Sequence, residues 1–145
     1  MKIKKKIVLV GMMGSGKSTI GALLSKKMNI KFIDLDQKIE TIEKQTISQI
    51  FKVKGEKYFR AIEAKTILSL LDSKEKELVL SLGGGSILDE KVRKNVKDNS
   101  LSFWLNWKND VIIKRISNSK KRPLAMKLNS FGIKKLINKR IKIYN

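Results

Sequence analysis

Apolar residues along this chain follow two different spacings. Four short runs of apolar residues indicate buried strands, because each run has the length of a strand and is bounded by polar residues or glycine. Between these runs, apolar residues recur every three or four positions, which is the spacing of one face of a helix. The alternation favours an α/β fold, with strands expected at 7–10, 31–36, 78–82 and 102–105, and helices at 20–28, 37–71, 89–97, from 109 and at 133–141.

The first apolar run stops at a glycine, and residues 11–18 match the pattern G-x-x-x-x-G-K-[ST]. Backbone N–H groups of such a loop surround phosphate oxygens at the start of a helix. Lys17 would add a positive charge for the outer phosphates, and the Ser18 hydroxyl would bind Mg²⁺. The alternative is a glycine-rich turn that fits the pattern by chance. The strand before the loop and the helix after it favour a phosphate-binding loop.

The second run, KFIDLD, ends in two carboxylates. Alternation along a strand would place Asp34 and Asp36 on one face, at the end of the strand where open α/β sheets bind ligands. We therefore expect metal and substrate roles for these two residues. The alternative for Asp36 is a cap on the helix that follows.

Residues 37–71 carry no strand pattern and are expected to form helices that break at Gly55. Glu63 lies inside the apolar stripe of the last of these helices, and a charge in that position needs a partner. Arg60, three residues earlier, is the nearest candidate. An arginine held in this way suits a carboxylate ligand, and a plain ion pair within the helix is the alternative. The stripe consists of Phe59, Ile62, Thr66, Ile67, Leu70 and Leu71.

The third apolar run leads directly into three consecutive glycines at 83–85. Glycines at the end of a strand remove side chains, so a ligand can approach the backbone N–H groups. A tight turn between a strand and a helix would also use one or two glycines, but three are more than such a turn requires. We therefore expect a ligand to approach the backbone here.

Two further arginines are expected near the ligands. A polar, basic stretch at 117–129 contains Arg122 and the single proline, and we interpret it as a lid that shields a nucleotide from water. A surface loop without function is the alternative. In the final helix, Arg140 lies at the border of the apolar stripe and should point toward protein or ligand.

Composition narrows the chemistry further. A chain of 145 residues fits one domain, and the absence of Cys and His excludes disulfides, thiolate metal sites and a zinc hydrolase. General acid–base chemistry then falls to Asp, Glu or Lys. No apolar run has the length of a membrane span, and the basic start leads directly into a strand, so a cytoplasmic protein is expected.

The formal net charge is +20, with 33 Lys and Arg against 13 Asp and Glu. Such a charge would suit nucleic acid, because lysines bind phosphates whatever the base sequence. The basic residues are scattered along the whole chain, however, which is typical of a solvated basic surface. We therefore expect no specific nucleic-acid partner and no membrane partner.

The ordered motifs GMMGSGKS, DLD, FRAIE, SLGGG, RPL and KRIKIY resemble those of the shikimate kinase family, over nearly the whole chain. This family comprises P-loop kinases of aromatic amino-acid biosynthesis. The resemblance implies one domain over 1–145, with a lid at about 117–129 and a three-layer α/β/α fold whose parallel strands run in the order 2-3-1-4. The family continues with a fifth strand and a C-terminal helix that this sequence does not contain, so strand four is expected to be an exposed edge.

The resemblance also implies a role for individual residues. Lys17, Asp36 and Arg122 are expected to act in catalysis, and Ser18 and Asp34 to bind Mg²⁺ with support from Ser81. Arg115 is expected to lie against the adenine. The expected ATP-binding residues are Gly14, Ser15, Gly16, Lys17, Ser18, Thr19, Arg115 and Arg122. The expected shikimate-binding residues are Asp36, Arg60, Gly84 and Arg140, with Glu63 near the substrate.

The activity implied is transfer of the γ-phosphoryl group of ATP to the 3-hydroxyl of shikimate, by a monomer with one Mg²⁺. Two alternatives stay open. One is a related small-molecule kinase, such as a gluconate-type kinase. The other, suggested by the charge and the missing C-terminal elements, is a nucleotide-binding or nucleic-acid-associated P-loop protein without turnover.

Overall fold

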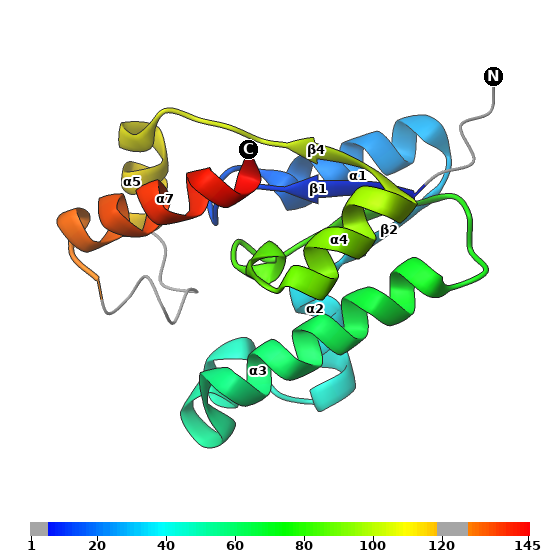
Figure 1. Cartoon of the computed structure of the whole chain (residues 1–145), viewed down its shortest axis with the longest axis horizontal. Coiled ribbons are helices and arrows are strands. Elements are labelled where there is room, and N and C mark those ends of the chain that lie inside the picture. The colour runs from blue at the N-terminus through cyan, green and yellow to red at the C-terminus, as the bar shows by residue number, and fades with distance from the viewer. Residues whose placement is uncertain (1–5, 119–127) are drawn as a thin grey trace.

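The computed structural model describes residues 6–118 and 128–145 (Figure 1). Four parallel strands form one sheet in the order β2-β3-β1-β4, as predicted. Within the described residues β4 pairs with β1 alone, so it forms an edge of the sheet, also as predicted. The strands are β1 (Lys6–Val10), β2 (Lys31–Asp34), β3 (Leu78–Ser81) and β4 (Ser100–Trp104).

Helices cover both faces of the sheet. Side chains of α2, α3 and α4 pack on one face, and α1 packs on the other. The pair α5 and α7 lies beyond the ends of β1 and β4, where the loops of the sheet meet (Figure 1). The helices are α1 (Lys17–Met28), α2 (Leu35–Glu43), α3 (Ile47–Asp72), α4 (Glu90–Asn99), α5 (Asn109–Ser117) and α7 (Ser130–Tyr144), with a short 3₁₀ turn, η1 (Ser86–Leu88).

Alternation along β1 divides the core between the two faces. Val8 contributes to the cluster under α3 and α4, whereas Ile7 and Leu9 pack with Leu24 on the α1 side. All three β1 residues are buried, because strands in the middle of a parallel sheet are covered on both faces. A third cluster joins the P-loop methionines to α5 and α7, so these two helices are anchored next to the loop.

The predicted strand 31–36 is too long by two residues. The strand ends at Asp34, and α2 begins at Leu35, because Leu35 and Ile39 are spaced to bury one face of a helix. The Asp34 carboxylate accepts a hydrogen bond from the Gln37 N–H and caps this helix. Asp36 therefore lies in the first helical turn, where it is neither a strand residue nor the cap.

Gly55 divides α3, as predicted. Gly55 has φ of 82° and ψ of 170°, which are not helical values, and it therefore separates two helical segments. Only glycine takes that conformation readily. The first segment starts at a capping box, in which the side chains and backbone N–H groups of Thr46 and Gln49 bond reciprocally. The second segment packs into the core of the sheet through Ile67 and Leu71 and holds Arg60 and Glu63 beside the glycines that follow β3.

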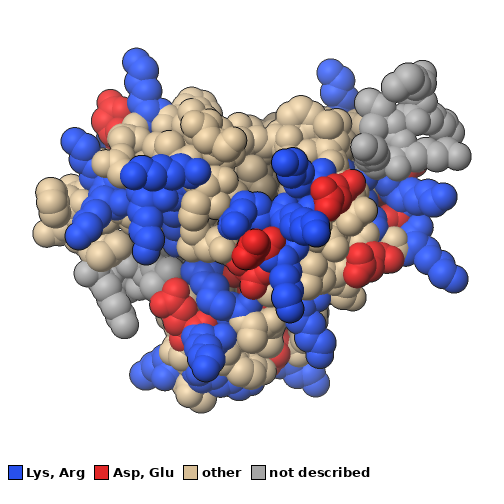
Figure 2. Space-filling model, in the orientation of Figure 1, with Lys and Arg blue, Asp and Glu red and all other residues tan. Residues whose placement is uncertain are grey.

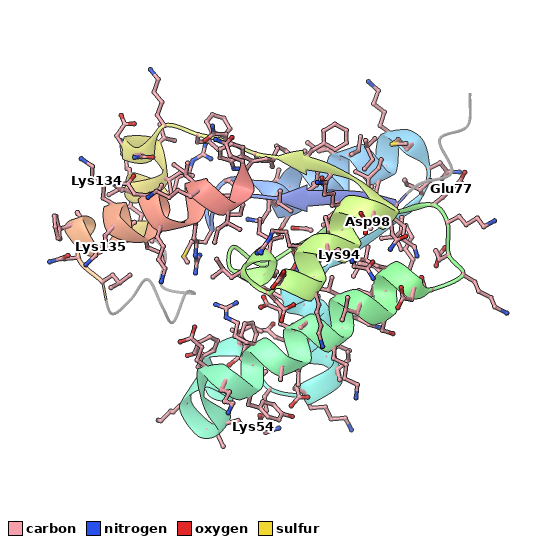
Figure 3. The ribbon with its side chains drawn as sticks, in the orientation of Figure 1. Lys54, Glu77, Lys94, Asp98, Lys134 and Lys135 are labelled. Carbon is pink, nitrogen blue, oxygen red and sulfur yellow. The ribbon has the colours of Figure 1, made fainter. Side chains whose placement is uncertain are left out.

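Charged side chains lie on many parts of the visible surface. Figure 2 shows Lys and Arg distributed across many elements, interspersed with smaller numbers of Asp and Glu. The side chains labelled in Figure 3 come from α3, the α3–β3 connection, α4 and α7, and all are exposed: Lys54, Glu77, Lys94, Asp98, Lys134 and Lys135. No single basic stripe is visible on this face. In the described ranges, no helix combines the length and apolar character that crossing a bilayer would need.

Candidate active site

The P-loop has the conformation that its glycines predict. Gly14 and Gly16 take φ of 80° and 88°, in the left-handed region that favours glycine. At Gly11, with φ of 144°, a Cβ would lie 2.8 Å from the Leu105 carbonyl oxygen, so a side chain would clash with the backbone after β4. The loop is therefore closely packed between β1, the β4–α5 connection and the start of α1.

Lys17 is buried within the loop that carries it. Its ammonium donates hydrogen bonds to the carbonyl oxygens of Gly11 and Met12, each at 2.8 Å, and to the Ser15 hydroxyl at 3.4 Å. These contacts hold the charge on the loop backbone, beside Gly14 and Gly16, where a polyphosphate would approach. Thr19 lies in the first turn of α1 and is exposed.

Ser18 and Asp34 lie together, as predicted for a metal site. The Ser18 hydroxyl donates a hydrogen bond to Asp34 Oδ2, and Asp34 is paired in register with the buried Ser81 of β3. Mg²⁺ takes hard oxygen ligands and is commonly bound by one or two protein groups together with phosphate and water. In the described part of the chain no group of three or more acidic residues gathers as an alternative metal site.

The three glycines after β3 are surrounded by the predicted substrate residues. A Cβ on Gly83 would lie 2.7 Å from Glu63 Oε1 and 3.5 Å from Asp36 Oδ1. A Cβ on Gly85 would lie 2.8 Å from Arg60 Nη2.

The middle glycine, Gly84, lies against the P-loop and α7. A Cβ on Gly84 would lie 2.8 Å from the Met13 backbone nitrogen and 3.3 Å from Arg140 Nη1. Residues from four separate elements thus converge on this loop, directly beside the P-loop.

Glu63 is the partner of Arg60, as predicted. Its Oε2 lies 2.7 Å from Arg60 Nη1, and its Oε1 accepts a hydrogen bond of 2.7 Å from the Ser86 hydroxyl. Glu63 is only 2% exposed, whereas the Arg60 side chain is 27% exposed. One face of the guanidinium is therefore fixed on a buried carboxylate, and part of it stays accessible to a ligand.

Arg140 is 3% exposed, which confirms that it points inward. Its Nε has no hydrogen-bond partner in the described structure, and its Nη1 contacts the Met12 sulfur at 4.0 Å. Burial lowers the pKa of Arg140 from its usual value, while Tyr144 acts in the opposite direction and the positive charge of Arg60 lowers the pKa further. Two arginines that lie close to one glycine loop favour an anionic ligand between them.

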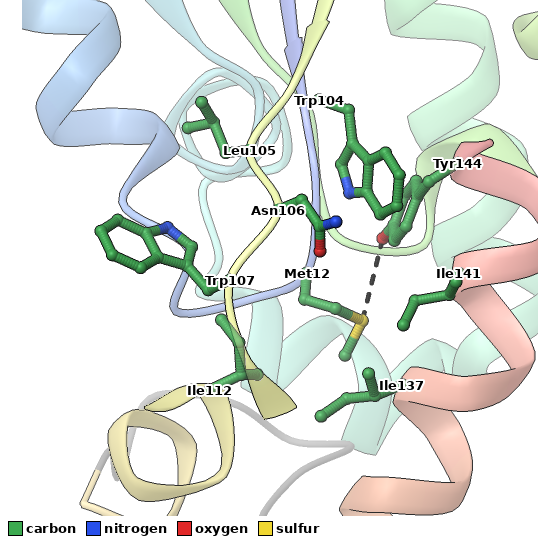
Figure 4. A pocket seen from close by; sticks show the side chains of 9 residues that line it. All are labelled: Met12, Trp104, Leu105, Asn106, Trp107, Ile112, Ile137, Ile141 and Tyr144. Atoms are coloured by element: carbon green, nitrogen blue, oxygen red, sulfur yellow. Dashed lines mark hydrogen bonds between the residues drawn. The ribbon is translucent and has the colours of Figure 1, made fainter. Parts of the chain in front are cut away.

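Tyr144 fixes the glycine loop from the last turn of α7. Its hydroxyl donates a hydrogen bond to the Gly84 carbonyl oxygen and also contacts the Met12 sulfur. Burial raises the pKa of this hydroxyl to about 12, so it stays protonated at neutral pH. Figure 4 shows the rings of Tyr144 and Trp104 side by side in the wall of a small pocket, with Met12 below them. The two rings lie 5.8 Å apart.

Arg115 contacts the outer side of the P-loop. Its Nη1 donates a hydrogen bond of 3.1 Å to the Gly14 carbonyl oxygen, and its guanidinium lies 4.7 Å from the centre of the Trp107 ring. This position is compatible with the expected place beside a nucleotide. Arg122 and nearly all of the expected lid lie outside the described residues.

Sequence reasoning missed three contacts that hold this site together. Ser86 bonds to Glu63, Tyr144 bonds to Gly84, and Trp107 donates a hydrogen bond to the Ser15 carbonyl oxygen at 2.8 Å. The partners are 23, 60 and 92 residues apart in the chain. No local spacing relates such partners, so only the folded arrangement reveals them.

Comparison with known proteins agrees with this geometry. The family model described as shikimate kinase matches residues 13–145. The shikimate kinase of Persephonella marina is 44% identical over 140 residues, which are 97% of this chain and 84% of that protein. The shikimate kinase of Bartonella quintana is 42% identical over 142 residues, 97% of this chain and 67% of that protein.

A solved structure gives the same result. The structure titled shikimate kinase from Acinetobacter baumannii in complex with shikimate matches with a TM-score of 0.84 and 32% sequence identity, over 96% of this chain and 75% of that chain. Sequence and structure thus agree over almost the full length described. The chain belongs to the shikimate kinase family and is a P-loop kinase.

Proposed function

We propose that this chain transfers the γ-phosphoryl group of ATP to the 3-hydroxyl of shikimate, giving shikimate 3-phosphate and ADP. The convergence of Arg60, Arg140 and Asp36 on the glycine loop, directly beside the P-loop, carries this proposal. Two arginines suit the carboxylate of shikimate, and an aspartate suits one of its hydroxyls. The family membership supports the same acceptor.

The P-loop side of the site binds ATP in this proposal. Backbone N–H groups of Gly14 to Thr19 and the Lys17 ammonium bind the phosphates, and Arg115 lies against the adenine. Ser18 and Asp34 would hold one Mg²⁺, with Ser81 behind Asp34. When bound, Mg²⁺ would neutralise phosphate charge and orient the outer phosphates.

The glycine-loop side binds shikimate. Arg60, fixed by Glu63, and Arg140, whose Nε has no partner among the described residues, both donate hydrogen bonds to the carboxylate. Gly84 presents its backbone N–H, and Tyr144 holds the next peptide plane through the Gly84 carbonyl. Binding of an anion compensates for the mutual repulsion of the two arginines and for the burial of Arg140.

Asp36 acts on the hydroxyl that receives the phosphoryl group. It orients this hydroxyl and accepts its proton as the bond from oxygen to the γ-phosphorus forms. The bond between the γ-phosphorus and its bridging oxygen breaks, and the electron pair leaves on ADP. Lys17 and Arg122 stabilise the negative charge on the transferring group. No covalent enzyme intermediate is needed.

A coupled assay of ADP release tests this function. The protein is incubated with Mg-ATP and millimolar shikimate, and the product is identified by mass spectrometry. We expect ADP and shikimate 3-phosphate to form in equal amounts, no ADP with gluconate as acceptor, and no activity in Lys17→Met. Absence of ADP above background with shikimate would contradict the proposal and favour nucleotide binding without turnover.

We further propose that the enzyme works as a monomer in the cytoplasm. ATP is abundant in that compartment, and all the proposed substrate residues come from one chain. Light scattering during size-exclusion chromatography measures the first point. A mass twice that of the 16.6 kDa chain at micromolar concentration would contradict it.

A further inference from the structure

Trp107 makes a contact with the P-loop that its position in the chain does not explain. It lies between β4 and α5, and its indole Nε1 donates a hydrogen bond of 2.8 Å to the Ser15 carbonyl oxygen. Ser15 is fully buried, whereas Trp107 is 43% exposed. Because this ring stays so exposed, packing surrounds it on part of its surface only, and the directed hydrogen bond to Ser15 is what fixes its orientation.

Figure 4 distinguishes this tryptophan from the other one in the chain. Trp104 points toward Tyr144 and lies over the pocket, whereas Trp107 lies on the opposite side of the β4–α5 segment, toward the start of α1. The two tryptophans are three residues apart but contact different parts of the site. They can therefore be changed separately.

Trp107 and Arg115 bind two consecutive carbonyl groups of the loop. Trp107 bonds to the Ser15 carbonyl and Arg115 to the Gly14 carbonyl, while the Arg115 guanidinium lies over the indole ring at 4.7 Å. The ring thus holds Arg115 by a cation–π contact at the same time as it holds the loop. The Trp107 indole, the Arg115 guanidinium and the two loop carbonyls are therefore in mutual contact, although the side chains and the loop come from separate segments of the chain.

The direction of the Ser15 carbonyl determines where the next N–H points. In a trans peptide the carbonyl and the following N–H point in opposite directions, and every described peptide bond is trans. A Ser15 carbonyl that is held outward by Trp107 therefore turns the Gly16 N–H toward the opposite side, where the loop would surround phosphate. The Ser15 N–H, by contrast, is used within the loop in a hydrogen bond to Met12.

We propose that Trp107 is a positioning residue for the nucleoside triphosphate. It acts by orienting the Ser15–Gly16 peptide toward the phosphates and by holding Arg115 for the base. This inference rests on the nucleotide-binding part of the proposed function and does not depend on which acceptor is phosphorylated. Trp107 therefore affects nucleotide affinity and leaves acceptor binding unchanged.

Calorimetric titration with Mg-ADP, in the absence of any acceptor, tests the proposal directly. Trp107→Phe keeps an aromatic ring but removes the donor, so we expect the Kd for Mg-ADP to rise about fivefold, the typical effect of one lost hydrogen bond. Trp104→Phe is the matched control and should leave the Kd unchanged. In the kinase assay, the KM for ATP should rise in Trp107→Phe while the KM for shikimate stays constant.

An unchanged Kd in Trp107→Phe, or equal increases in the KM for both substrates, would overturn the proposal. A second measurement does not require that variant to fold. In Trp104→Phe, Trp107 is the only tryptophan, and its fluorescence should change saturably as Mg-ADP binds. Emission that stays constant while calorimetry detects binding would also overturn the proposal. If the wild-type protein shows no kinase activity with shikimate but binds Mg-ADP, and this binding weakens in Trp107→Phe, only the assignment of the acceptor is contradicted.

Discussion

Replacing Glu63 with glutamine tests how the substrate arginine is held. The Glu63 carboxylate makes two hydrogen bonds of 2.7 Å, one with Arg60 and one with Ser86, and its side chain is almost fully buried. Glutamine has nearly the same shape but keeps one oxygen and carries no charge. The glutamine oxygen can accept from Arg60 and its amide can donate to the Ser86 hydroxyl, but the contact with Arg60 is no longer one between two charges, and Arg60 loses its buried counter-charge.

The expected loss of stability follows from these contacts. A hydrogen bond that involves a charged group contributes about 1.5–3 kcal/mol to the free energy of unfolding. The Arg60 side chain is 27% exposed and also lies 3.6 Å from Glu56, so solvent and this second carboxylate compensate in part. We expect Glu63→Gln to lower the free energy of unfolding by about 1–2 kcal/mol, which corresponds to a decrease in Tm of about 3–8 °C.

Urea unfolding followed by circular dichroism measures the first effect, and kinase kinetics measure the second. The KM for shikimate should rise because Arg60 is no longer fixed, while the KM for ATP should stay constant. Glu56→Gln is the matched control, because it removes a carboxylate from the same arginine at an exposed position, where the loss should be below about 0.5 kcal/mol. If Glu63→Gln is destabilised no more than this control, the contact does not hold Arg60 and the reasoning fails.

Three further predictions concern the same site. Asp36→Asn should lower kcat by about 10²–10⁴-fold, the range for loss of a general base, and leave the Kd for Mg-ADP unchanged; a wild-type kcat would exclude this role. Arg140→Met should raise the KM for shikimate at least about tenfold, through loss of a charge-assisted hydrogen bond, without lowering Tm, because it removes a buried charge whose Nε has no partner in the described structure. Burial raises the Tyr144 pKa from 10.0 to about 12, so between these pH values the unfolded chain loses this proton first and the wild type loses stability as pH rises. Unfolding measured at pH 9, 10 and 11 should therefore show wild type losing about 1 kcal/mol relative to Tyr144→Phe between pH 10 and pH 11, and parallel curves would refute the assignment.

The sequence determined the features that depend on neighbouring residues. The P-loop, the break at Gly55 and the pairing of Arg60 with Glu63 all follow from glycine conformations or from helical spacing, and the structure contains each of them. The parallel order of the strands was predicted from the resemblance of the motifs, and it was correct.

Local patterns misplaced the boundary after β2. Alternation in KFIDLD favoured a strand through Asp36, but burial of Leu35 and Ile39 against the core starts the helix at Leu35. Over only six residues, the strand period of two and the helix period of 3.6 cannot be told apart in the sequence. Packing against the core therefore decides which structure forms. Packing also decides which face of α1 is buried. The apolar spacing predicted this helix correctly, but its buried face carries Gly21 and Ser25, whereas Leu23 is exposed.

Tertiary structure alone decided how the site is fixed. The hydrogen bonds from Tyr144 to Gly84 and from Trp107 to Ser15 join positions that no sequence period relates. They form because the strands are parallel, so β1, β3 and β4 all end on the same side of the sheet. Helices α5 and α7 pack there against the P-loop methionines. The sequence thus identifies the groups that carry the chemistry, whereas the packing of distant elements sets the direction in which each group points.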